Sequence, residues 1–374
     1  MMPTCFLHQV HTWAKPTVPL VTAVLLTISL LLLPQPQAAA ANGSDSELAF
    51  DDQPLAEALH LPDWFDLSFL DLNESLEEAL SEGKSGLIIY FGRKDCAYCK
   101  ALLEDNWGDP AIARYTQQHF NVIAIEVRGS RTVTDFRGKK WSEKDYSTAM
   151  RTNFTPTLLF YNKQAQLALK LPGYRPKYQF RAALEYVADA HYTRESFRDY
   201  LARAESALSF GLPELNDNEV FQPPPYNLNR RNTRDSESLA PLMVFFEHPR
   251  CHACDVLHGD TLSNPQIEQQ LQQLDVVQLN THTNTPVITP AGHKTTASAW
   301  ASELDLTFAP ALLFFDEKGN EILRIESVIR FYRLNKVLEY ITGKHYLSYP
   351  TFQNWLQHSR NQRNASQVND DSRP

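Results

Sequence analysis

Short apolar runs alternate with amphipathic and polar stretches along most of this chain. The runs Leu87–Phe91 and Leu242–Phe246 are continuous and rich in aromatic residues, a pattern typical of a strand that is buried on both faces. A segment with helical spacing follows each run directly, and a second helix begins further on with Pro110 or Pro265 near its first turn. Both halves of the chain therefore begin with the same predicted order of strand, helix and helix.

The remaining pattern also recurs in both halves. Each half predicts a strand, a helix, two strands joined by a turn, and a long closing helix with one more helix beyond it. In the first half the predicted strands are 122–127, one directly after Pro156, and 167–171, and the predicted helices are 143–151 and 177–190. In the second half the predicted strands are 276–279, one directly after Pro310, and 321–325, and the predicted helices are 296–304 and 330–342. This alternation predicts an α/β fold in two tandem domains, each with a mixed central sheet flanked by helices.

An internal repeat supports the two-domain interpretation. At a shift of about 155 residues, LIIYFGRKDCAYCKALLEDNWGDPAI (87–112) matches PLMVFFEHPRCHACDVLHGDTLSNPQI (241–267). Further on, GKKWSEKDYSTAMRTNFTPTLLFYN matches GHKTTASAWASELDLTFAPALLFFD, and the glycine and proline of each copy are equally far apart. The spacing therefore predicts one domain over 87–203 and a second over 241–358.

The first forty-one residues have the pattern of an export signal. Lys15 is the only formal charge there, the apolar run Val18–Leu33 follows it, and the small-residue run Ala38–Ala41 comes next. An uncleaved membrane anchor is the alternative, but this apolar run is short for a span that needs about 20 residues. The sequence therefore predicts a signal peptide over 1–41 and a periplasmic location.

Three segments lie outside the repeats and the signal. Residues 42–86, with a helical stretch at Asn73–Ser81, are expected to pack on the first domain. The segment 204–240 is polar and proline-rich, which predicts a tether between the domains. The tail 359–374 is polar and is predicted to be disordered.

Composition and charge narrow the function. The 43% hydrophobic and 21% charged content is that of a globular protein. The net charge of −9, without a basic stripe, argues against a nucleic-acid partner. Cys5 would leave with the signal, and the other four cysteines form two C-x-x-C pairs, so that none is left for a long-range structural disulfide. The cysteines are therefore expected to carry chemistry.

The two C-x-x-C pairs are Cys96/Cys99 and Cys251/Cys254. Each begins a predicted helix, where free backbone N–H groups and the helix dipole stabilise a thiolate on the first cysteine. The second cysteine lies about one turn later and can resolve a mixed disulfide. Cys96 and Cys251 are therefore the expected nucleophiles, and Cys99 and Cys254 the resolving cysteines.

The prolines that precede the next strand form the second element of each site. Thr155-Pro156 and Ala309-Pro310 stand where a cis peptide would turn the chain beside the cysteine pair. A proline there leaves a backbone edge free to pair with an extended substrate strand. These four residues are therefore predicted to line the substrate groove.

The pattern of apolar strand, C-x-x-C, helix and Thr-Pro or Ala-Pro resembles the thioredoxin superfamily. More narrowly, DWFDLSFLDLNESLEEA and the GKKWSEKDYSTAMRTNFTPTLLFY segment resemble the SoxW-type periplasmic thioredoxins. The resemblance implies a thioredoxin fold, reduction or exchange of disulfides in exported proteins, no cofactor besides the redox-active disulfides, and electrons from a membrane thiol transporter. It also assigns Gly173 to the substrate groove, whereas Ser327 replaces that glycine in the second copy. A monomer is expected.

The chain departs from the thioredoxin pattern around both cysteine pairs. Asp95 precedes the first pair, and like charge would raise the pKa of Cys96. Tyr98 lies within that pair and His252 within the second, where a cationic imidazole would lower the thiol pKa. These residues are predicted to tune the two pairs, the first toward a more reducing potential, which permits a relay between the domains.

Other functions fit the same residues. A disulfide oxidase or isomerase would use the same cysteines, since the direction depends on potentials and on the electron partner. A binding or chaperone module could keep the fold without redox turnover. A soft-metal site is a further alternative, and its candidate ligands are His248, Cys251, His252, Cys254 and His258.

Overall fold

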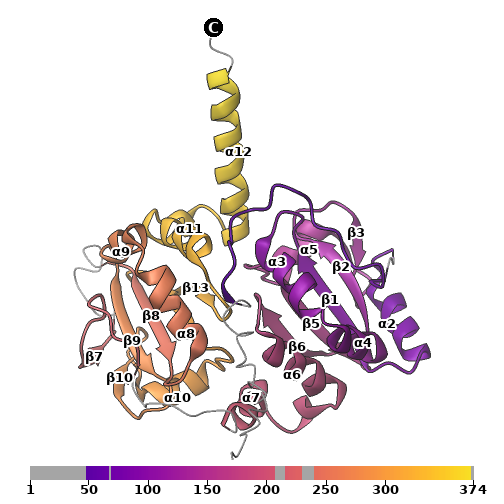
Figure 1. Cartoon of the computed structure of the whole chain (residues 1–374), viewed down its shortest axis with the longest axis horizontal. Coiled ribbons are helices and arrows are strands. Elements are labelled where there is room, and N and C mark those ends of the chain that lie inside the picture. Colours follow the sequence, from indigo (N-terminus) through magenta and orange to yellow (C-terminus); the bar gives the residue numbers. More distant parts are fainter. Residues whose placement is uncertain (1–47, 67–68, 207–214, 230–239, 372–374) are drawn as a thin grey trace, which may run out of the picture. The chain divides into compact units, whose positions relative to one another are not determined.

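The computed structural model describes residues 48–66, 69–206, 215–229 and 240–371. Two domains of matching architecture, shown in Figure 1, belong to one compact unit that spans Asn42–Pro374. The predicted signal peptide, 1–41, lies outside the described residues. Within the described ranges, no helix combines the length and the apolar character needed to cross a bilayer.

The first domain is built on a four-stranded sheet in the order β2-β1-β5-β6. Strand β1 runs parallel to β2 and antiparallel to β5, which pairs antiparallel with β6. The strands are β1 Gly86–Gly92, β2 Phe120–Glu126, β5 Thr157–Asn162 and β6 Leu167–Pro172, and a small hairpin adds β3 Thr132–Thr134 and β4 Lys140–Ser142.

Helices flank this sheet on both sides (Figure 1). They are α2 Leu72–Ser81, α3 Ala97–Ala101, α4 Pro110–His119, α5 Glu143–Ala149, α6 Lys177–Ala188 and α7 Phe197–Ser206. Side-chain caps set where several of them start. The carboxylate of Asp71 accepts from two N–H groups of the first turn of α2, and Asp109 does the same for α4, whose first residue is Pro110.

The second domain repeats this architecture. Its sheet has the equivalent order β9-β8-β12-β13, with β8 parallel to β9 and antiparallel to β12. The elements are β8 Leu242–Glu247, α8 His252–Val256, α9 Pro265–Leu271, β9 Asp275–Asn280, β10 Pro286–Ile288, β11 Lys294–Thr296, α10 Ala297–Glu303, β12 Ala311–Phe315, β13 Glu321–Ile325, α11 Phe331–Thr342 and α12 Phe352–Asp371. The predicted fold class, two tandem α/β domains with mixed sheets, is confirmed.

The central strand of each domain is buried on both faces. In β1, Leu87, Ile89 and Phe91 pack into one hydrophobic cluster, while Ile88 and Tyr90 pack into another on the opposite face. Strand β8 divides its side chains between two clusters in the same alternating way. Because successive side chains of a strand point to opposite faces, a run with two buried faces must be apolar at every position.

Part of the predicted tether is an element of the second domain. Strand β7, Tyr226–Asn227, pairs with β10, so that the prediction of a plain linker over 204–240 is wrong for this part. The Gln222 N–H also donates to the Val276 carbonyl at 2.8 Å, and the Leu228 side chain is buried. These contacts come from single apolar residues that stand among prolines and asparagines. Their spacing follows neither the helical nor the strand period, so that the sequence pattern does not reveal them.

The prediction of a disordered tail over 359–374 is wrong for 359–371, because α12 continues to Asp371, and residues 372–374 lie outside the described residues. The first turns of this helix are anchored by Phe352, Trp355 and Leu356, which are buried in the core of the second domain. Packing of these turns provides the costly helix nucleus, and propagation through the polar residues that follow then adds one hydrogen bond per residue.

Leu228→Ala tests whether the segment around β7 is part of the second domain. We expect a loss of roughly 2–5 kcal/mol in the free energy of unfolding, because a buried leucine leaves a cavity. Leu347→Ala in the same domain is the control, since that side chain is 74% exposed, and it should change stability by less than about 0.5 kcal/mol. Urea unfolding measures both values. Equal values for the two variants would mean that 215–229 only tethers the domains.

Candidate active site

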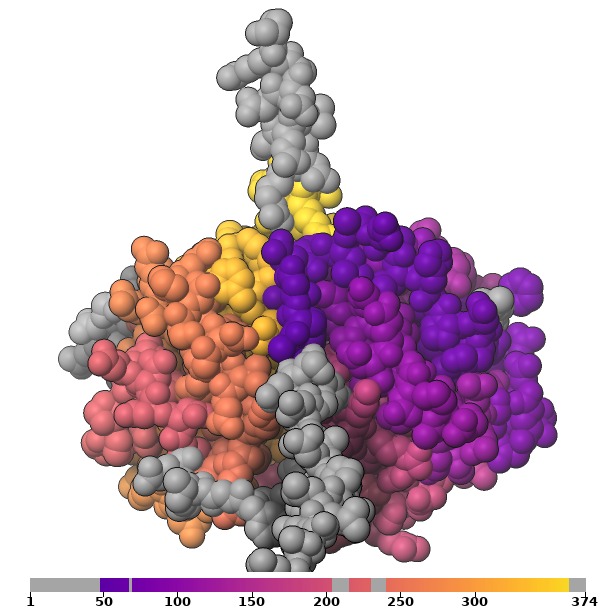
Figure 2. All heavy atoms as spheres, viewed as in Figure 1, coloured from indigo at the N-terminus to yellow at the C-terminus, as the bar shows by residue number. Residues whose placement is uncertain are grey.

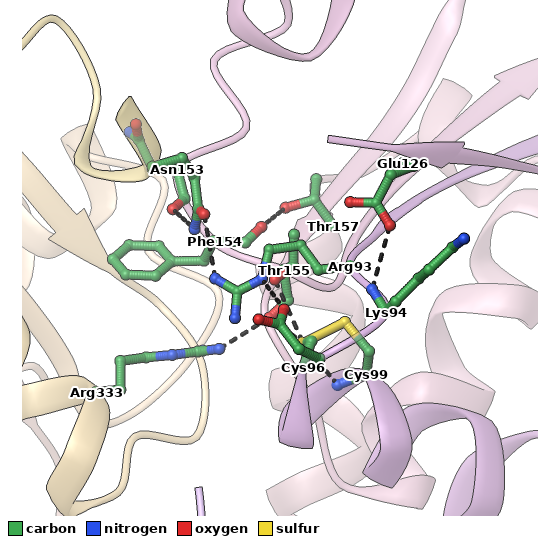
Figure 3. The surroundings of a disulfide bond; sticks show 12 residues. Arg93, Lys94, Cys96, Cys99, Glu126, Asn153, Phe154, Thr155, Thr157 and Arg333 are labelled. Atoms are coloured by element: carbon green, nitrogen blue, oxygen red, sulfur yellow. Dashed lines mark hydrogen bonds and ion pairs between the residues drawn. A yellow bond between two sulfur atoms is a disulfide. The ribbon is translucent and has the colours of Figure 1, made fainter. Parts of the chain in front are cut away.

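The first cysteine pair forms a disulfide at the start of α3 (Figure 3). Cys96 is the N-cap residue of this helix, with an extended backbone, and its Sγ accepts a hydrogen bond from the Cys99 N–H at 3.0 Å. Both cysteines are buried, with 3% and 0% of their surface exposed. The helix N-terminus thus directs a backbone donor at the sulfur that would carry negative charge in the reduced protein.

The proline loop lies against this sulfur. The Thr155–Pro156 bond is cis, and the Thr155 hydroxyl donates to Cys96 Sγ at 3.3 Å. On the far side of the proline, the Gly173 N–H donates to the Pro156 carbonyl at 2.8 Å. Gly173 has a φ of 75°, in the left-handed region that favours glycine. The structure therefore brings together the predicted groove residues of the first domain.

The second pair has the same backbone geometry. Cys251 caps α8, forms a disulfide with Cys254, and its Sγ accepts from the Cys254 N–H at 3.1 Å. The Ala309–Pro310 bond is cis as well. Since Ala309 has no hydroxyl, the second site lacks the side-chain donor that Thr155 supplies to the first.

Asp95 is surrounded by arginines. Its carboxylate pairs with Arg93 at 2.9 Å, with Arg128 at 3.8 Å and with Arg360 of α12. Burial alone would raise the pKa of Asp95, but Arg93 and Arg360 outweigh it and hold this pKa below its usual range. The like-charge effect on Cys96 that the sequence suggests is therefore offset by cations on the carboxylate itself.

The Tyr98 side chain is buried and its hydroxyl makes hydrogen bonds to two other segments of the chain. Its hydroxyl donates to Asp52 Oδ2 at 2.8 Å and accepts from the Arg330 N–H at 2.7 Å. Burial, followed by the charge of Asp52, raises the pKa of Tyr98 well above its ordinary value. Tyr98 therefore remains a neutral hydroxyl that links the lead-in segment, the first cysteine pair and α11.

In the second domain, His252 of α8 is exposed. A buried pair is formed by Glu247, which ends β8, and His258, which lies in the short helix Leu257–Leu262 directly after α8. His258 Nε2 lies 3.0 Å from Glu247 Oε1, and Gln278 Nε2 donates to Glu247 Oε2 at 2.8 Å. Glu247 is completely buried. The sequence does hold a signal for this pair, because Glu247 ends an apolar strand four residues before Cys251, where the first domain has Gly92.

The alternative metal site is not assembled. In the described parts of the chain, no three His, Cys, Asp or Glu side chains are grouped so as to hold a metal ion. Of the five candidate ligands, His258 faces Glu247, and His248 stacks on His282 with ring centroids 4.9 Å apart. The two sulfurs of the site are joined in a disulfide.

Fold and sites define a protein with two α/β domains, each carrying a C-x-x-C disulfide beside a cis-proline. The family model described as a thioredoxin-like domain matches residues 72–188 and 236–342. Because these two segments make up more than half of the chain, the protein belongs to the thioredoxin-like family. No curated protein sequence matches the chain.

The solved structures that match parts of this chain are distant in sequence. A thioredoxin-fold protein from Helicobacter pylori is 22% identical, with 39% of this chain and 94% of that one covered and a TM-score of 0.33. A thioredoxin from Thermus thermophilus is 23% identical, with coverages of 34% and 88% and a TM-score of 0.27. The C-terminal domain of Neisseria meningitidis DsbD in the reduced form is 13% identical, with coverages of 28% and 82% and a TM-score of 0.22.

The first site has the Thr155 hydroxyl and the second site has Ala309 in its place. Substitutions can therefore remove the hydroxyl from the first site and introduce one into the second. In the reduced protein, Thr155→Ala should raise the pKa of the Cys96 thiol, because a hydrogen bond to the thiolate is lost. The alkylation rate of Cys96 at neutral pH should then fall by roughly 3- to 10-fold. Ala309→Thr is the reciprocal change and should lower the pKa of Cys251. The pH dependence of iodoacetamide labelling measures both effects, and unchanged profiles would contradict this role of the hydroxyl.

Proposed function

We propose that this protein is an exported thiol–disulfide oxidoreductase that reduces disulfides in periplasmic proteins. The observation that carries the proposal is the geometry at Cys96. Its sulfur lies at a helix N-terminus, accepts from the Cys99 N–H and the Thr155 hydroxyl, and is next to a cis-proline. A second copy of the arrangement, without the hydroxyl, lies at Cys251.

The reaction would proceed by two exchanges. The Cys96 thiolate attacks one sulfur of a substrate disulfide, a mixed disulfide forms, and the other substrate sulfur leaves as a thiolate that takes a proton from water. Cys99 then loses its proton and attacks Cys96 Sγ, and the second substrate sulfur leaves as a thiolate that takes up a proton. The substrate gains two electrons, and the Cys96–Cys99 disulfide forms.

Turnover requires a reductant for the new disulfide. The resemblance to SoxW-type thioredoxins supports a membrane thiol-electron transporter as this donor. An external dithiol can take its place in a test, because exchange with it follows the same chemistry.

Insulin reduction by dithiothreitol tests this proposal. We expect the full chain to accelerate the reaction over the blank, and Cys96→Ser to remove most of the acceleration because the attacking thiolate is lost. Cys251→Ser should lower the rate less, and Leu347→Ala, at an exposed side chain of the second domain, should leave it unchanged.

A wild-type rate equal to the blank would contradict the enzyme function. Loss with Cys251→Ser alone would assign the chemistry to the second domain instead. Faster oxidation of a reduced substrate than reduction of an oxidised one would favour the oxidase alternative.

Export can be tested separately from catalysis. Residues 1–41 fused to alkaline phosphatase, which is active only outside the cytoplasm, should give active enzyme. Leu25→Arg with Leu26→Arg should lower that activity roughly tenfold, because charges interrupt the apolar run. The mass of the mature chain should place its first residue near Ala40 or Ala41, whereas an intact N-terminus would indicate an anchor.

A further inference from the structure

The two domains contact each other through equivalent positions of the repeat. Gly173 and Ser327 follow their cis-prolines at the same distance, 156 to 173 and 310 to 327. A Cβ atom on Gly173 would lie only 2.2 Å from the Ser327 Cβ. Next to this contact, the Val328 N–H donates to the Tyr174 carbonyl at 3.2 Å. The groove rims of the two domains therefore touch.

An arginine from each domain reaches the proline loop of the other. Arg333 of α11 donates from Nη2 to the Thr155 carbonyl at 2.8 Å (Figure 3), and its guanidinium lies 3.3 Å from the Tyr98 ring centroid. In return, Arg175 donates to the carbonyl and hydroxyl of Thr307, each at 3.1 Å. Both arginines are more than nine-tenths buried.

The lead-in segment holds Arg333 in place. The carboxylate of Asp52 accepts from the N–H groups of Tyr332 and Arg333, both at 2.8 Å, and thereby caps α11. In Figure 2 this N-terminal segment, in indigo, lies against the yellow C-terminal part of the chain. Asp52 also accepts from the Tyr98 hydroxyl. One buried carboxylate thus connects α11 of the second domain to the first cysteine pair.

In this arrangement only 3% of the Cys96 surface is exposed. The remaining cavity, lined by Cys96, Thr155 and Arg333 among others, has a volume of about 40 Å³, enough for water but not for a peptide strand. Its backbone acceptor, the Thr155 carbonyl, is already used by Arg333. Arg333 therefore occupies the edge with which an extended substrate would pair.

The Arg333 contact leaves one polar atom of its guanidinium unsatisfied. Arg333 Nη1 is buried and has no hydrogen-bond partner among the described residues. Burial lowers the pKa of Arg333, which reflects the cost of removing this cation from water. A buried charge with incomplete hydrogen bonding returns part of that cost when it is exposed again.

We propose that Arg333 is an internal plug of the first active site, and that a protein disulfide gains access to Cys96 when the second domain withdraws it. This inference deepens the proposed function, because it states how the same site is regulated. A substrate that binds the Thr155 carbonyl competes with Arg333, so that binding favours the open arrangement.

Labelling of the reduced full chain by N-ethylmaleimide measures access to Cys96 directly. We expect Arg333→Ala to increase the labelling rate of Cys96, followed by peptide mass spectrometry, about tenfold, because a hydrogen bond from a charged group closes the site. Arg324→Ala is the matched control, since Arg324 contacts Glu321, Glu326 and Leu304 within the second domain. It should label at the wild-type rate.

A second pair of variants acts on the interface without changing a charge. Gly173→Ala places a methyl group against Ser327 and should increase labelling of Cys96. Ser327→Gly in the same chain removes the opposing side chain and should return the rate toward wild type. The alanine at position 173 strains the backbone equally in the single and the double variant. A labelling rate that returns toward wild type in the double variant therefore reports the contact between the domains and not the local backbone strain.

Wild-type labelling rates in both Arg333→Ala and Gly173→Ala would overturn the proposal. An equal increase in Arg324→Ala would overturn it too, because the effect would then be general loosening. Labelling needs only a reduced thiol, so that it gives an answer even if the protein reduces no insulin, and the two proposals fail separately.

Discussion

The constraint on which both sites depend is a central strand that is buried on both faces and leads directly into a helix. Strand β1 has neighbours on both edges and hydrophobic clusters on both faces, so that its backbone cannot shift without breaking all of them. The first cysteine follows at the end of this rigid element, where the N–H groups of α3 have no partner within the helix. The thiol therefore meets fixed donors rather than mobile ones.

Because the cysteines lie on rigid elements, a protein substrate can reach them only if another part of the molecule moves. The contacts between the domains include the buried charged groups Arg333, Arg175 and Asp52. They also include buried apolar side chains, because Phe154 packs into the second domain's cluster and Phe308 and Val328 pack into the first domain's cluster. Buried charges add little net stability compared with apolar packing, because desolvation offsets much of their attraction. The buried charges therefore fix the geometry of the contact at Cys96, while the apolar side chains beside them supply most of its stability.

The sequence predicts what is local or repeated. The apolar runs at 87–91 and 242–246, the helix start at each C-x-x-C pair and the two X-Pro steps all follow from short-range pattern and spacing, and the structure has cis bonds at Pro156 and Pro310. The residues that contact these segments from the other domain cannot be predicted from the sequence. Arg333 aligns in the repeat with Gln179, an ordinary polar position on a helix, and nothing near Asp52 indicates that it caps a helix of the other domain. Such contacts depend on how two folded units meet, which no local pattern encodes.

The stability of the thiolates in the two cysteine pairs also depends on contacts that the sequence does not reveal. From the sequence, Asp95 suggests a destabilised thiolate at Cys96, with Arg93 and Lys94 as charges that counter it. In the structure Arg93 and Arg360 pair with Asp95, while Thr155 donates to the Cys96 sulfur. At Cys251 the Cys254 N–H donates to the sulfur, and Ala309 has no hydroxyl to replace that of Thr155. The groups that contact the two sulfurs therefore differ from those that the neighbouring residues in sequence suggest.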